Sequence, residues 1–158
     1  MPEPVLAEAA GQSGSYELTV ERLLAASPER VFDAWVNPDT FVKWWGPEGF
    51  TTPEHLLDVR PNGRWRAVMR APDGQRHIVS GVYREIDRPS CLVFTWAWED
   101  EDGLRGHDSE VELTLRAAGS GTHLHLVHHK IASTDSRDSH REGWIATLNH
   151  LEALFASP

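Results

Sequence analysis

Histidines in the last strand-like segment are the first candidates for chemistry, because an imidazole titrates near neutral pH and can bind a metal. In a strand, every second side chain points to the same face. In the segment 122–130, three histidines share the face expected to meet solvent: His123, His125 and His129. His128 shares the opposite face with Leu124 and Leu126. The sequence therefore predicts that His128 points into the protein.

Two interpretations of His128 remain open. An inward imidazole could hydrogen-bond a bound molecule or transfer a proton, so His128 is the best catalytic candidate if the protein is an enzyme. Alternatively, a backbone carbonyl or a neighbouring acid such as Glu85 could satisfy the ring inside the protein. No cysteine or closely matched carboxylate completes a zinc site around the outward histidines, and we therefore expect no metal.

Other signatures of catalysis are absent from the sequence. The single cysteine, Cys91, is expected to be a small buried side chain without a catalytic role. The sequence has no glycine-rich phosphate loop after a strand, no Gly-x-Ser-x-Gly elbow and no His-Glu-x-x-His helix. We therefore expect no cofactor, and the residues favour binding over catalysis without excluding an enzyme.

Seven tryptophans are the unusual feature of the composition. An indole buries a large area and offers one N–H donor, so tryptophans serve both cores and ligand pockets. We expect an apolar cavity for a small molecule, and its predicted ligand-binding residues are Trp44, Trp45, Trp65, Met69, Phe94, Trp96, Trp98, His128, Trp144 and Leu148. Both faces of the segment 91–99 are apolar, so its periodicity leaves the inner face open, and we choose the aromatic face.

The elements that would position these residues follow from the sequence pattern. A strand begins near Tyr16, and two short helices follow it, each with a capping residue and a proline: Ser27-Pro28 and Asn37-Pro38. Turn residues then separate six further strands, at about 55–60, 64–71, 76–86, 91–99, 108–117 and 122–130. A capping box at Ser139–Glu142 predicts the start of a long amphipathic helix.

Composition and charge narrow the domain organisation and the partners. Residues 1–14 lack periodicity and predict a flexible tail, whereas residues 15–158 are expected to form one domain. The net charge of -9 argues against binding to nucleic acid or to an anionic membrane. No apolar stretch approaches the roughly 20 residues that cross a bilayer, and the N-terminus lacks the pattern of a secretory signal. We therefore expect a soluble, cytoplasmic protein.

The order of one strand, two short helices, six strands and a long helix resembles the START-like superfamily, also called SRPBCC. Several segments are similar to the family named after the activator of the heat shock protein 90 ATPase, the AHSA-like family: 27–35, 44–47, 63–74, 81–86, 92–96 and 140–144. The resemblance implies an α+β helix-grip fold, in which a curved antiparallel sheet of about seven strands wraps around the long C-terminal helix.

The same resemblance leaves three functions open. The first is the binding of a small hydrophobic or aromatic molecule in an internal cavity, as a carrier, a sensor or a stress-related protein. The second is an enzyme similar to polyketide cyclases, with an acid–base group such as His128 in the cavity. The third is a co-chaperone-like interaction module. A homodimer is compatible with each of them.

Overall fold

The computed structural model describes residues 16–156, which form one seven-stranded antiparallel sheet and three helices. The strands are β2 (Tyr16–Leu24), β3 (Thr51–Leu57), β4 (Arg64–Arg70), β5 (Arg76–Asp87), β6 (Cys91–Glu99), β7 (Ser109–Ala118) and β8 (Gly121–Ile131). The helices are α1 (Pro28–Val36), α2 (Pro38–Trp44) and α3 (Thr134–Ala156). The predicted tail at residues 1–14 lies outside the described residues.

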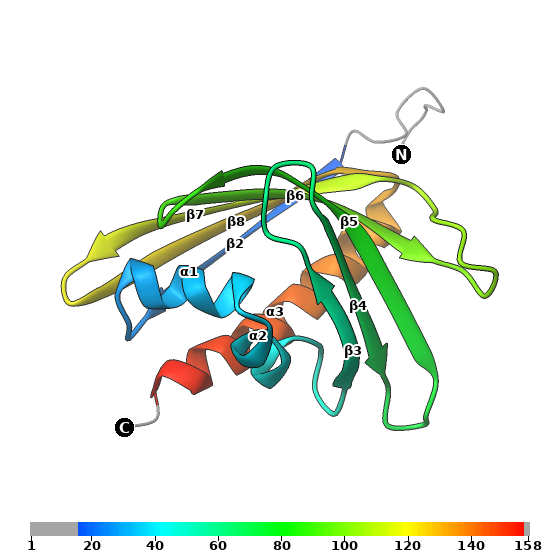
Figure 1. Ribbon diagram of the computed structural model, residues 1–158, viewed down its shortest axis with the longest axis horizontal. Helices are drawn as coiled ribbons and strands as arrows, with labels where there is room; N and C mark the ends of the chain where they lie inside the picture. The colour runs from blue at the N-terminus through cyan, green and yellow to red at the C-terminus, as the bar shows by residue number, and fades with distance from the viewer. Residues whose placement is uncertain (1–15, 157–158) are drawn as a thin grey trace.

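The sheet is curved, and the long helix α3 crosses its concave side (Figure 1). The strand order is β2-β8-β7-β6-β5-β4-β3, so each strand from β3 to β8 pairs with its neighbour in sequence, and β2 pairs with β8. The short helices α1 and α2 connect β2 to β3 and lie on the same side of the sheet as α3 (Figure 1). This arrangement confirms the predicted helix-grip fold.

Alternation of side chains gives the sheet one face in the core and one face towards solvent. In β8, the buried residues Leu124, Leu126 and His128 alternate with more exposed ones, as predicted. On the outer face, Nε2 of His123 lies 2.7 Å from Oε1 of Glu21 in the neighbouring strand β2. The core therefore lies between the concave face of the sheet and the three helices.

The two short helices begin where the sequence predicts. The side-chain oxygen of Ser27 accepts the backbone N–H of Arg30 at 3.3 Å and caps α1. Asn37 ends α1 and caps α2, and its Oδ1 accepts the backbone N–H of Asp39 at 2.9 Å. Gly46 follows α2 with φ 108, a left-handed conformation that glycine adopts easily. The chain turns there towards β3.

Strand β3 begins earlier than the predicted strand at 55–60, and that prediction is wrong in its bounds. Residues 58–63 form a turn, in which Asn62 has the left-handed φ of 65. Pro53, which interrupts the strand pattern, lies where the register between β3 and β4 is irregular. A proline is tolerated there because β3 is at the edge of the sheet and needs fewer backbone donors.

The capping box predicted at Ser139–Glu142 is also wrong, because α3 already begins at Thr134. Ser133 caps the helix instead, since its side-chain oxygen accepts the backbone N–H of Ser136 at 3.1 Å. Serine and glutamate three residues apart also fit inside a helix, and the polar residues of the first turn hid the true start. One of the extra helical residues, Ser136, lines the cavity described below.

Candidate functional site

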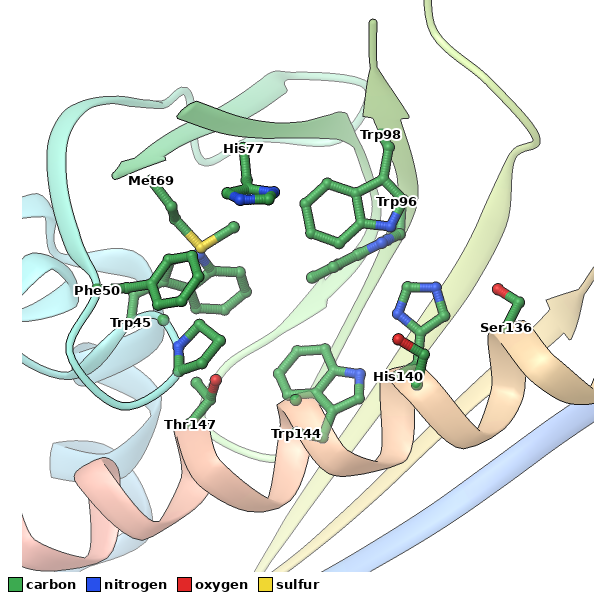
Figure 2. A pocket seen from close by; sticks show the side chains of 14 residues that line it. Trp45, Phe50, Met69, His77, Trp96, Trp98, Ser136, His140, Trp144 and Thr147 are labelled. Carbon is green, nitrogen blue, oxygen red and sulfur yellow. The ribbon is translucent and has the colours of Figure 1, made fainter. Parts of the chain in front are cut away.

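A cavity of about 260 Å³ lies between α3, strands β4 to β6 and the loop after α2 (Figure 2). An engineered protein cavity of about 150 Å³ is large enough to bind benzene. The volume here therefore suits a molecule with one or two aromatic rings. A second void of about 10 Å³ lies beside Trp45, Trp65 and Phe94 and has room for no more than one water molecule.

The sheet and the loop after α2 form the apolar wall of the cavity. Its members are Trp45, Phe50, Met69, Trp96 and Trp98. The ring of Trp96 is central, with its centroid 5.9 Å from that of Trp45 and 5.3 Å from that of Trp144 on α3. Trp98 lies at the rim and is 42% exposed. An entering molecule would thus meet aromatic rings on several sides.

The helix α3 forms the opposite, more polar wall. Its polar members are Ser136, Ser139, His140 and Thr147. These positions recur at spacings of three, four and seven residues, which places them on one face of a helix. Gly143 lies among them, and a Cβ atom added to it would meet no atom within 4 Å. The space over this turn of α3 is therefore open.

His128 lies behind this wall, fully buried between β7, β8 and α3. The indole N–H of Trp144 donates to its Nδ1 at 3.0 Å, and Ser109 Oγ lies 2.7 Å from its Nε2. Because an indole N–H can only donate, Nδ1 must be the acceptor and the neutral ring carries its proton on Nε2. Ser109 then accepts from His128 and donates to the carbonyl of Trp96 at 3.1 Å.

Both ring nitrogens of His128 are therefore engaged inside the protein. Burial lowers the pKa of His128 well below 6.5, and the positive charge that His140 and His129 carry when protonated lowers it further. This imidazole stays neutral at physiological pH. The second interpretation from the sequence requires internal partners for the ring, and the structure contains them. They are Ser109 and Trp144 rather than Glu85 or a backbone carbonyl.

His140 lies nearer to the cavity than His128 does, and it is one of the lining residues. Its ring is stacked on that of Trp98, with centroids 6.2 Å apart at an interplanar angle of 5°, and it meets Trp96 edge to face at 5.7 Å (Figure 2). Burial lowers the pKa of His140 to about 4. Within residues 16–156, hydrogen bonds of histidine rings involve His107, His123, His128 and His150, so the ring of His140 has no such partner.

The ten predicted site residues divide into two groups of five. Those that line the cavity are Trp45, Met69, Trp96, Trp98 and Trp144. Those that pack behind it, in the core, are Trp44, Trp65, Phe94, His128 and Leu148. Two of this second group use their indole N–H on the backbone, since Trp44 donates to Ala34 and Trp65 to Thr95, each at 2.9 Å.

The inner face of β6 was left open by its periodicity. Trp96 and Trp98 line the cavity, so the aromatic face points inward at this end of the strand. The opposite face carries Val93 and Ala97, which are buried as well. Burial on both faces explains why the sequence pattern of β6 does not distinguish them.

Sequence reasoning missed the polar part of the cavity. His77, Ser136, Ser139, His140 and Thr147 line the cavity and were not predicted, and neither was Phe50 in the apolar wall. Phe50 lies in a loop, where side chains follow no periodicity. Ser136 lies before the predicted start of α3, whereas Ser139 and His140 fall within the predicted capping box and were assigned to the helix end. Once α3 is extended back to Thr134, the spacing from Ser136 to His140 and Trp144 places them on one helical face, and this is the signal that could have found them.

Three buried indoles have an unusual environment. Nε1 of Trp35, Trp45 and Trp96 has no hydrogen-bond partner among the described residues. Their rings meet neighbouring aromatic rings edge to face, for example Trp35 against Trp44 with centroids 4.7 Å apart. Edge-to-face contacts are favourable because the positive edge of one aromatic ring meets the negative face of another.

Remaining features bear on metals, thiol chemistry and membranes. Within residues 16–156, no group of three or more His, Cys, Asp or Glu side chains could hold a metal ion. Burial raises the pKa of the Cys91 thiol to about 11, with a further contribution from the charge of Glu85. The thiolate that would act as a nucleophile is therefore scarce at neutral pH.

None of the described helices has the length and apolarity needed to span a membrane.

Comparison with known proteins places the chain in a family. The model of the activator of Hsp90 ATPase homolog 1-like protein family matches residues 25–156. The AHSA1 protein from Silicibacter pomeroyi is 37% identical, with a TM-score of 0.82 over 89% of this chain and 98% of that one. A protein from Chromobacterium violaceum is 30% identical, with a TM-score of 0.80 over 90% of this chain and 98% of that one. No curated protein matches. The chain therefore belongs to the activator of Hsp90 ATPase homolog 1-like protein family.

Proposed function

We propose that the protein binds a small apolar or aromatic molecule in the cavity between α3 and strands β4 to β6. The observation that carries this proposal is the ring of tryptophans around an unfilled space of about 260 Å³, formed by Trp45, Trp96, Trp98 and Trp144. Cavities of this kind, concave and mostly apolar with a few polar groups, are typical of small-molecule sites. The helix-grip fold of the family supports a ligand-binding domain in general.

The energetics favour an aromatic occupant. Each square ångström of apolar surface that leaves water contributes about 25 cal/mol, and each well-oriented contact between aromatic rings adds about 0.5–1.5 kcal/mol. Trp96 and Trp98 meet edge to face, at an angle of 86° between their planes. They therefore offer differently oriented surfaces to a flat molecule, and a rigid ring loses little conformational entropy on binding.

The histidines support binding rather than catalysis. Both nitrogens of His128 are engaged by Trp144 and Ser109, so this residue would have to break buried hydrogen bonds before it could exchange a proton with a ligand. His140 faces the cavity, but its pKa of about 4 makes it a weak base at neutral pH. Neither His128 nor His140 is therefore tuned for an acid–base mechanism like that of a polyketide cyclase.

Isothermal titration calorimetry with naphthalene tests the proposal, because this compound is rigid, aromatic and uncharged. We expect saturable binding to the wild-type protein with one site per chain. Gly143→Leu would fill the space above α3 and abolish this binding, since Gly143 lines the cavity and has room for added atoms. The matched control is Glu142→Leu, which places the same side chain on an exposed position one residue earlier.

Each outcome is informative. Binding that disappears in Gly143→Leu and persists in Glu142→Leu supports the cavity as the site. No saturable heat with the wild-type protein would contradict the proposed function. Equal binding to all three proteins would show that the ligand binds outside the cavity, which would contradict the proposal. Thermal unfolding of the variants shows whether each is folded at the temperature of the titration.

A further inference from the structure

We propose that the cavity selects an uncharged aromatic molecule that carries a hydroxyl group, and that His140 is the residue that recognises this hydroxyl by accepting its hydrogen bond. This inference rests on the proposed function, and it names the class of ligand and the residue that sets the specificity. It depends on three features of the cavity: the absence of charge on its walls, the free acceptor on α3, and the aromatic rings that hold this acceptor in place.

The walls disfavour a charged ligand. Among the described residues that line the cavity, none is Asp, Glu, Lys or Arg. A carboxylate or an ammonium group would lose its hydration on entry without gaining an opposite charge, which is costly. Apart from the indole N–H groups, the polar side-chain groups are hydroxyls and imidazoles, namely those of Ser136, Ser139, Thr147, His77 and His140. Such groups suit a ligand that hydrogen-bonds without carrying a charge.

His140 is a free acceptor at this wall. Its ring has no hydrogen-bond partner within the described residues, unlike that of its neighbour His128, whose ring centroid is 4.6 Å away. The lowered pKa keeps the ring neutral at physiological pH, so one nitrogen always offers a lone pair. The ring is partly buried, and a ligand hydroxyl in the cavity could donate to this lone pair.

The surroundings of His140 distinguish it from Ser136 and Ser139 on the same helix. A helical serine can satisfy its hydroxyl on the backbone carbonyl of the preceding turn, and therefore Ser136 and Ser139 do not need a ligand. His140 is also held in place, stacked on Trp98 and edge to face against Trp96. Figure 2 shows the imidazole beside both indoles, so a molecule in the cavity would lie close to it.

A pair of matched probes tests this inference: 2-naphthol, which can donate a hydrogen bond, and 2-methoxynaphthalene, which cannot. Their Kd values are measured by calorimetry for the wild-type protein and for His140→Phe, which keeps an aromatic ring but removes the acceptor. One neutral hydrogen bond changes affinity by about fivefold. We therefore expect the ratio of the two Kd values to shift by about fivefold against 2-naphthol in His140→Phe.

The matched control is His77→Phe, the same substitution on the sheet side of the same cavity. It should leave the ratio unchanged to within about twofold. If His140→Phe keeps the preference for 2-naphthol, or if His77→Phe removes it, the inference is wrong and the proposed function stands. If neither compound binds the wild-type protein, the proposed function fails and the inference fails with it.

A measurement on the wild-type protein covers the case in which His140→Phe does not fold. The nitrogen-15 chemical shifts of the histidine rings are recorded with each probe. The resonance of the unprotonated nitrogen of His140 should move on addition of 2-naphthol and stay nearly constant with 2-methoxynaphthalene. Equal changes with both compounds would contradict a hydrogen bond from the hydroxyl, because the two probes share the naphthalene ring and its oxygen and only 2-naphthol carries the donor.

Discussion

The indole N–H of Trp144 donates to Nδ1 of His128 at 3.0 Å, and this hydrogen bond joins helix α3 to strand β8. Trp144 therefore has two roles, since one side of its ring lines the cavity while its N–H completes the environment of a fully buried imidazole. The bond also sets the tautomer of His128, whose Nε2–H donates to Ser109 Oγ. Ser109 in turn donates to the carbonyl of Trp96. The wall of the cavity is thus built on a buried polar network.

Replacement of Trp144 by phenylalanine should destabilise the protein by about 2–4 kcal/mol. The variant leaves Nδ1 of His128 without a donor, which costs about 1–3 kcal/mol for a buried acceptor, and the lost ring volume adds to this. Urea denaturation followed by far-UV circular dichroism measures the change. Trp98→Phe is the control, because Trp98 is 42% exposed, and a loss below about 1 kcal/mol is expected there. Equal losses in both variants would contradict the role of the hydrogen bond.

The stability of the protein should depend on His140 between pH 6.5 and 4. Burial lowers the pKa of His140 from 6.5 to about 4 in the folded state, whereas the unfolded chain keeps the ordinary value. The unfolded state therefore binds the proton first as the pH falls, and stability is lost progressively over this window. The full shift corresponds to as much as about 3 kcal/mol, and above pH 6.5 the contribution is complete.

Comparison with His140→Phe isolates this effect from the many carboxylates that titrate in the same range. His128 stays in both proteins, so its own contribution largely cancels. We expect the free energy of unfolding of the wild type, minus that of the variant, to fall as the pH decreases from 6.5 to 4. Urea denaturation at several pH values measures this difference. A difference that stays constant across the window would mean that His140 is solvated like an ordinary histidine.

Two glycines should respond in opposite directions to the same change. Gly143→Ala should stabilise α3 by about 0.5–1 kcal/mol, because alanine is the better helix former and the added Cβ meets no atom within 4 Å. Gly81→Ala should destabilise the sheet by about 3 kcal/mol or more, because its Cβ would lie 1.9 Å from the carbonyl oxygen of Thr95. That oxygen also accepts the N–H of Trp65. Urea denaturation of both variants checks the two signs.

Much of the fold could be predicted from local sequence, because strand alternation, capping residues and turn residues act over a few positions. The starts of α1 and α2 at Ser27 and Asn37 and the inward side of His128 follow from such local patterns. The starts of β3 and α3 did not follow from local patterns. Pro53 in β3 is tolerated only at a sheet edge, and Ser133 competes with Ser139 as the cap of α3. Both choices depend on the neighbours that each segment finds after folding.

By itself, the sequence determined that the chain forms a helix-grip domain with many tryptophans on inward faces. Only the tertiary structure decided which of them surround open space, since Trp44 and Trp65 pack in the core while Trp96 and Trp98 line the cavity. It also decided that His128 is bonded internally and that His140 faces the cavity without a partner. The physical reason is that periodicity specifies the face on which a side chain lies, whereas the space left beside it depends on how sheet and helix pack together.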